Sequence, residues 1–87
     1  MPSVYILQSQ KNGRYYIGST NDIERRMQEH LSGKTFSLRY LLPLRLVFQQ
    51  EFSTLLEARR MESKLKKFKS RDIIERIIKE EKITTGP

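Results

Sequence analysis

The sequence of 87 residues is long enough for one domain with a modest core and too short for a second folded unit. It has no cysteine and only short apolar runs, which excludes disulfides, thiolate metal sites and membrane spans. The formal net charge of +7 favours a polyanionic partner, most simply nucleic acid, although a basic protein without such a partner has the same charge.

The N-terminal segments predict a β-hairpin. Residues 3–9 (SVYILQS) and 14–19 (RYYIGS) are rich in strand formers, and Asn12-Gly13 between them is a strong turn signal. These residues also lack a basic region followed by a long apolar stretch, so we expect no signal peptide and a cytoplasmic protein.

The hairpin has two possible registers. A four-residue loop pairs Tyr5 with Gly18 and Tyr16 with Leu7, which makes the two tyrosines diagonal neighbours on one face. A two-residue turn keeps them on one face but four positions apart. The sequence leaves both registers open.

A helix is predicted after the hairpin. Asn21 is the expected N-cap, with Glu24 three residues later as in a capping box, and Ser32-Gly33 ends the helix. Its apolar stripe, at spacings of four residues, consists of Ile23, Met27 and Leu31.

Residues 34–43 are expected to be irregular, and residues 44–51 predict a third strand. Thr54 is the expected N-cap of the next helix, with Glu57 at the capping-box position, and this helix runs to about Lys69. Its buried face consists of Ala58, Met61, Leu65 and Phe68.

Ser70 is the expected N-cap of a last helix, whose apolar stripe consists of Ile73, Ile74, Ile77 and Ile78. The order is therefore β-β-α-β-α-α. It predicts an α/β fold of the α+β type, a three-stranded antiparallel sheet flanked by helices. We expect one domain over residues 1–82 and a disordered tail over residues 83–87.

Three charged residues fit either a structural or a functional role. Arg26 and His30 lie four apart and share a helix face beside the apolar stripe. Arg26 can lie over the core edge with its head in water, and His30 can be a satisfied boundary histidine. Glu62 lies within or beside the buried stripe of its helix, where a carboxylate is costly unless it is paired or holds a metal. Glu62 therefore either pairs with a neighbouring arginine, such as Arg59 or Arg26, or is a functional acid.

The remaining candidates also have ordinary explanations. Tyr5 and Tyr16 can be ordinary half-buried tyrosines whose hydroxyls reach water. Gly18 can allow backbone or ligand to approach closely, or it can simply end the strand. The basic run over residues 64–71 is either a solvated helix surface or a docking surface for phosphates. The cations that this docking surface offers are Lys64, Lys66, Lys67 and Arg71.

Over residues 3 to about 79, this pattern resembles the GIY-YIG nuclease superfamily. The second signature triplet is intact as Tyr16-Ile17-Gly18, and the first is degenerate as Ser3-Val4-Tyr5. Arg26 stands ten residues after Tyr16, where the family has its catalytic arginine, and His30 follows four residues later. The likeness is greatest to the small stand-alone bacterial branch, which is mostly uncharacterised.

The resemblance extends to the later helix. The stretch EARRMESKLKKF is similar to the family segment that carries the metal-binding glutamate, which places that glutamate at Glu62. The sequence departs from the pattern at two points. Ser3 replaces the glycine of the first triplet, and Ser63 and Lys64 follow Glu62 where many members place an asparagine nearby or later.

The resemblance implies an endonuclease that hydrolyses phosphodiesters of nucleic acid, with DNA as the expected substrate. It implies one divalent ion, Mg²⁺ or Mn²⁺, on Glu62, and Arg26 as the cation that neutralises charge on the phosphate. Tyr5, or as a second choice Tyr16, would orient or deprotonate the attacking water, which requires the metal ion and Arg26 to lower the pKa of the phenol.

Secondary roles follow for the other candidates. His30 is expected to contact phosphate or assist proton transfer, and Gly18 and the cations of the basic run are expected to contact substrate. Two rival functions stay open: a nucleic-acid-binding module without cleavage, and an adaptor whose basic surface meets an acidic protein. Glu62 favours the enzyme, because a carboxylate beside the phosphate would only repel the ligand of a pure binder. The sequence does not give the oligomeric state, for which a monomer is the default.

Overall fold

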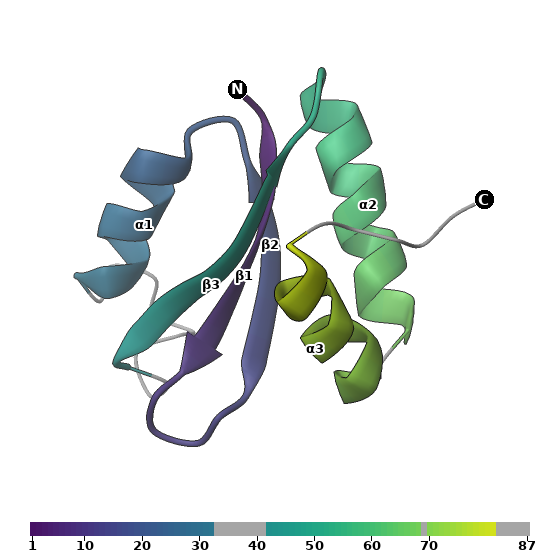
Figure 1. Cartoon of the computed structure of the whole chain (residues 1–87). Helices are drawn as coiled ribbons and strands as arrows, with labels where there is room; N and C mark the ends of the chain where they lie inside the picture. The colour runs from purple at the N-terminus through teal and green to yellow at the C-terminus, as the bar shows by residue number, and fades with distance from the viewer. Residues whose placement is uncertain (33–41, 69, 82–87) are drawn as a thin grey trace.

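The computed structural model describes residues 1–32, 42–68 and 70–81 (Figure 1). The predicted order β-β-α-β-α-α is confirmed. The expected irregular segment, apart from its last two residues, and the expected tail over residues 83–87 lie outside the described residues. The elements are β1 (Ser3–Ser9), β2 (Tyr15–Thr20), α1 (Ile23–Leu31), β3 (Leu44–Glu51), α2 (Leu55–Phe68) and α3 (Arg71–Glu80).

The three strands form one antiparallel sheet in the order β2-β1-β3, so β1 is central and β2 is an edge strand. Helix α1 covers one face of the sheet, and α2 and α3 cover the other (Figure 1). Every residue of β1 except Gln8 is buried, as expected for a central strand with both faces covered. The edge of β2 therefore lies between two helical layers.

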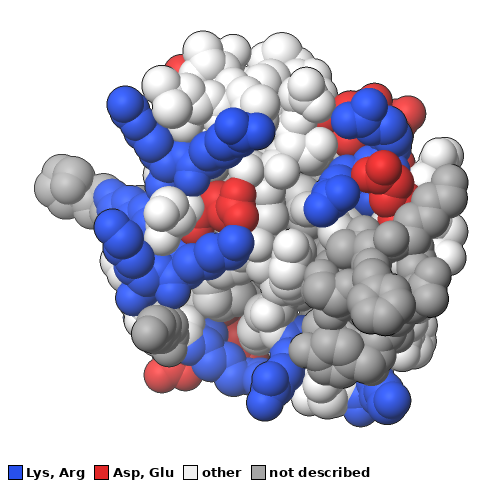
Figure 2. Space-filling model, turned by 180° about the vertical axis from the view of Figure 1, so that it is seen from behind, with Lys and Arg blue, Asp and Glu red and all other residues white. Residues whose placement is uncertain are grey.

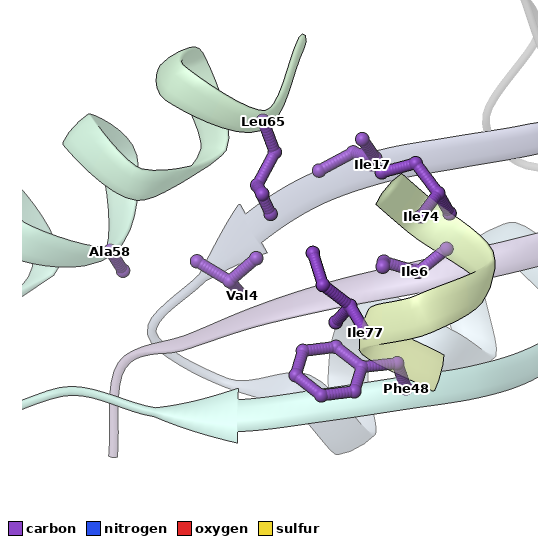
Figure 3. Packing of buried hydrophobic residues seen from close by; sticks show 8 residues of the cluster. All are labelled: Val4, Ile6, Ile17, Phe48, Ala58, Leu65, Ile74 and Ile77. Atoms are coloured by element: carbon purple, nitrogen blue, oxygen red, sulfur yellow. The ribbon is translucent and has the colours of Figure 1, made fainter. Parts of the chain in front are cut away.

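Two apolar clusters fill the space on either side of the sheet. On the α2–α3 face, Val4 and Ile6 of β1 meet residues of both helices, as Figure 3 shows. Burial of these side chains is the main force that holds the layers together. The buried members of this larger cluster are Val4, Ile6, Ile17, Phe48, Ala58, Leu65, Ile74 and Ile77. On the α1 face, Tyr5 and Leu7 pack with Leu44 and with Ile23 and Met27 of α1, and the side chain of Leu31 lies outside the described part.

The structure selects the four-residue hairpin loop. Tyr5 pairs with Gly18 and Leu7 with Tyr16, and the Ser9 amide donates to the Arg14 carbonyl at 2.9 Å to close the loop. Gly13 in this loop has φ +76°, a conformation that costs glycine little. The two-residue turn was the wrong alternative.

The first helix cap was predicted one residue too early. Asp22, not Asn21, is the N-cap of α1, and its carboxylate accepts from the Arg25 amide at 3.1 Å. The hydroxyl of Thr20 accepts from the Asp22 amide at 3.1 Å, so no capping-box glutamate is needed there. The other two caps were predicted correctly: Thr54 accepts from Glu57 N–H and Ser70 from Ile73 N–H.

Gly18 is required because the Tyr5 ring lies directly over its Cα. A Cβ at this position would stand 2.5 Å from Cζ and 2.9 Å from Cε2 of Tyr5, and would overlap the hydroxyl. The ring is held in the buried α1-face cluster, and only 1% of Tyr5 is exposed. Gly18, the glycine of the second triplet, therefore leaves the space that the ring of Tyr5, the tyrosine of the first triplet, occupies.

Gly18→Ala should lower the free energy of unfolding by about 1–3 kcal/mol, because overpacking forces a buried ring out of place. Urea denaturation measures this loss. In a double-mutant cycle with Tyr5→Ala, the double variant should lose less than the sum of the single losses. Additive losses would show that the Tyr5 ring and Gly18 do not conflict.

Candidate active site

A buried polar cluster lies between the sheet and α1. The Tyr5 hydroxyl is 3.0 Å from Nε2 of His30, and the Arg26 guanidinium also donates a hydrogen bond to this hydroxyl. His30 is 1% exposed, so the expectation of a boundary histidine was wrong. The tautomer of His30 decides which of the two groups donates the hydrogen in this contact. Nδ1 has no partner among the described residues.

The second phenol stands beside this cluster but reaches the surface. The Tyr16 ring meets the His30 ring edge to face, with centroids 5.8 Å apart, and the Tyr5 and His30 centroids are also 5.8 Å apart. Tyr16 is half-buried, and the ammonium of Lys66 lies 6.0 Å from its centroid. The two tyrosines therefore differ in access to water: Tyr5 is enclosed and Tyr16 is not.

The carboxylate of Glu62 approaches β2 from the opposite face. It accepts a short hydrogen bond from the Ser19 hydroxyl and pairs with Lys66 at 2.6 Å. Its side chain is 20% exposed. Of the two alternatives left open by the sequence, pairing with Arg59 or Arg26 is not seen among the described residues, since Lys66, four residues further along α2, and Ser19 on the facing strand supply the partners of Glu62.

The edge of β2 brings the two halves together. Successive residues of the strand point to opposite faces, so Tyr16 and Gly18 face α1 while Ser19 faces Glu62 on α2. A hollow of about 340 Å³ lies between the first turns of α1 and α2, and Ser19, Arg26 and Arg59 are among its lining residues. In Figure 2, basic side chains flank a mostly uncharged strip, with acidic atoms among them.

Burial sets the protonation states on the α1 side. Burial raises the pKa of Tyr5, and the hydrogen bond from Arg26 offsets this only in part. Burial, and then the charge of Arg26, lower the pKa of His30. The hydrogen bond to Tyr5 raises the pKa of Arg26. At neutral pH the cluster is thus a neutral phenol, a neutral imidazole and a charged guanidinium, which also pairs with Glu29 at 3.3 Å.

The expected substrate-binding cations are spread over a wider surface. Lys66 contacts both Glu62 and the Tyr16 ring, and Arg71 lies over the Tyr15 ring, 5.0 Å from its centroid. Lys64 lines a separate depression beside Phe52, and Lys67 is exposed in the last turn of α2. Only Lys66 of this set therefore lies at the carboxylate.

The chain matches the family model described as "GIY-YIG catalytic domain" over residues 1–78. The chain belongs to the GIY-YIG family. A UPF0213 protein of Streptococcus pneumoniae serotype 4 is 40% identical over 67 residues, which cover 76% of this chain and 67% of that protein. A UPF0213 protein of Bacillus licheniformis is 40% identical over 79 residues, 90% of this chain and 79% of that one.

A solved structure agrees in fold. The solution NMR structure of a UPF0213 protein from Bacillus halodurans matches with a TM-score of 0.56 and 35% identity, over 100% of this chain and 89% of that one. The GIY-YIG domain is a nuclease domain, and these relatives form a small stand-alone bacterial family that is uncharacterised. Among the described helices, none has the length and apolar character that a membrane span needs.

GIY-YIG nucleases typically use a divalent metal ion, and the donor atoms at Glu62 suit one hard cation. The described residues contain no group of three acidic or histidine side chains that would enclose an ion. Glu62 and the Ser19 hydroxyl nevertheless offer two kinds of oxygen, and Mg²⁺ is commonly held by one or two carboxylates while it keeps several waters. The site fits such an open arrangement.

The sequence prediction did not include Ser19, because no local motif marks it as the partner of a distant carboxylate. The available signal was the alternation of β2. Ile17 belongs to the core on the α2–α3 face, so Ser19, two residues on, faces α2 as well. Combined with the position of Glu62 next to the buried stripe of α2, this predicts a contact between the two.

His30 should make stability depend on pH. Because its pKa is lowered in the folded state, the unfolded chain binds more protons below about pH 6.5. Unfolding free energy should therefore fall as pH drops from about 6.5 toward the folded-state pKa, and His30 should add no slope above that range. Urea denaturation from pH 7.5 to 5.0 measures this, with His30→Gln as comparison. Equal slopes in both proteins would show that His30 is not buried in its neutral form.

Proposed function

We propose that the protein is a divalent-metal-dependent endonuclease that hydrolyses phosphodiester bonds in DNA. One arrangement around β2 supports the proposal: Ser19 lines a hollow together with Arg26 and also binds Glu62, and Tyr16 lies beside Lys66, the ion-pair partner of Glu62. A structural ion pair would need no phenol and no second cation there. A divalent ion held by Glu62 would supply Lewis-acid stabilisation of charge on the phosphate.

Arg26 is suited to bind the phosphate. Its guanidinium lines the hollow next to Ser19 and is held from behind by the Tyr5 hydroxyl and from the side by Glu29. A planar guanidinium fixed in this way presents its remaining donors to phosphate oxygens in a geometry that a lysine cannot match. Such fixed donors stabilise the negative charge that develops in the transition state.

Tyr16, rather than Tyr5, is the phenol suited to the attacking water. A group that takes a proton from water must reach that water, directly or through one other molecule. Tyr5 is enclosed and its pKa is raised, whereas Tyr16 is half-buried beside Lys66. We therefore reverse the order expected from the sequence: Tyr16 orients or deprotonates the nucleophile, and Tyr5 positions Arg26 and His30.

Lys66 has a double role in this scheme. Its ammonium neutralises Glu62 at 2.6 Å, yet its side chain is 50% exposed and can turn away. A phosphate arriving at the β2 edge offers Lys66 another anion and leaves the carboxylate to the metal ion. His30 contributes as the buried partner of Tyr5 and has no access of its own to the substrate.

Removal of the site residues should abolish metal-dependent cleavage and leave the fold intact. Glu62→Gln, Arg26→Ala and Tyr16→Phe should each lower the cleavage rate by about 100-fold or more, the scale of a lost transition-state contact. Tyr5→Phe should lower the cleavage rate by less, because the ring still packs and only the hydrogen bond to Arg26 is removed. Nicking of supercoiled, single-stranded and branched DNA with Mg²⁺ or Mn²⁺ measures the rates, and circular dichroism checks the fold.

Glu51→Gln and Arg76→Ala are matched controls, since both residues are exposed and lie outside the site. Both should cleave like the unmodified protein. If all variants and controls cleave alike, the activity is a contaminant and the assignment fails. If the protein binds these DNAs but never cleaves with any divalent ion, the binding-module alternative is correct.

A further inference from the structure

A second hollow lies along β2, beyond Tyr16 and away from Glu62. Its volume is about 400 Å³, within the range of small-ligand sites. It lies between the start of β2 and the junction of α2 with α3. Arg71 reaches across its end to the hairpin loop, where its Nη2 is 3.7 Å from the position that a Cβ on Gly13 would take.

The floor of this hollow is apolar. Ile17, Leu65 and Ile74 line it and belong to the buried core, and Figure 3 shows their side chains close together. The half-buried rings of Tyr15 and Tyr16 form its wall. A floor of this kind binds a flat, weakly hydrated group, and aromatic rings beside it allow stacking.

The rim is basic. Arg14, Lys66 and Arg71 line the hollow, and no ion pair of Arg14 is seen in the described ranges 1–32, 42–68 and 70–81. Arg71 packs on the Tyr15 ring with its guanidinium 5.0 Å from the ring centroid, and Glu75 pairs with it at 3.7 Å. The charge of the rim suits a phosphate, and the guanidinium held on a ring is preorganised to receive one.

The hollow is connected to the candidate active site by two shared residues. Tyr16 lines the hollow and also meets His30, and Lys66 lines it and also pairs with Glu62. A ligand here would therefore be the immediate neighbour of the phosphate at the β2 edge.

We propose that this hollow binds one unstacked nucleotide next to the bond that is cut. Its base lies on the apolar floor beside the tyrosines, and its phosphate lies at the basic rim. The inference rests on the proposed function and adds a substrate class to it: nucleic acid in which a base is already unpaired, since extracting one from a duplex costs energy. An apolar floor inside a basic rim matches a nucleotide better than an acidic peptide, which has no flat apolar group to bury.

Nucleotide binding tests this without any cleavage. In EDTA and low salt, ¹⁵N NMR spectra of Glu62→Gln protein are recorded with dAMP, deoxyadenosine or inorganic phosphate. We expect dAMP to shift the amides of residues 14–17, 65–66 and 70–74, and to bind more tightly than either fragment. Arg14→Gln and Arg71→Gln should each weaken dAMP binding by about 10-fold, the effect of losing a charged hydrogen bond. Tyr15→Leu should weaken the binding of dAMP and leave the binding of inorganic phosphate unchanged.

Arg76→Gln is the matched control, because it removes one cation of α3 that does not line the hollow, and it should bind dAMP normally. Phosphate and dAMP binding equally well would overturn the base site. Shifts located elsewhere, or none at millimolar dAMP, would overturn the whole inference. If the protein cleaves DNA but does not bind dAMP in this hollow, the nucleotide site is rejected and the proposed nuclease function stands. Nucleotide binding by a protein that never cleaves rejects the nuclease proposal alone.

Discussion

The contact between the Tyr5 ring and Gly18 is the constraint on which the site depends. It fixes the register of β1 against β2, because only a residue without a side chain can lie under the ring. That register sets Tyr16 diagonally beside Tyr5, where both rings meet His30. The Tyr5 hydroxyl then holds Arg26. The two signature triplets are thus one packing unit, in which the second supplies the space that the first fills.

The sheet edge explains how the proposed site fits into so small a domain. A central strand is covered on both faces, so its side chains are shielded from water, as Tyr5 is. An edge strand gives access to both faces within a few ångströms, and its side chains alternate between them. Tyr16 and Ser19 use this property: the Tyr16 ring meets the His30 ring of α1, and the Ser19 hydroxyl binds Glu62 of α2. The proposed site therefore draws side chains from both faces of one sheet.

The sequence predicted the elements well because local signals decide them, and it predicted the contacts between elements less well. Caps at Thr54 and Ser70 are local hydrogen bonds and could be read directly. The cap at Asp22 was misplaced because Thr20, in the preceding strand, satisfies its amide. The partners of Glu62 were missed because β2 and α2 are far apart in the chain. Burial of His30 was missed for the same reason: its helix position shows a face, not what covers that face.

The central claim is that Glu62 holds a divalent ion at the β2 edge, and paramagnetic broadening by Mn²⁺ in ¹⁵N NMR spectra tests it most directly. The account predicts broadening centred on the amides of Ser19, Glu62 and Lys66, weaker at Tyr16, and absent from these residues in Glu62→Gln. Broadening centred on another part of the surface, or unchanged in Glu62→Gln, would contradict it.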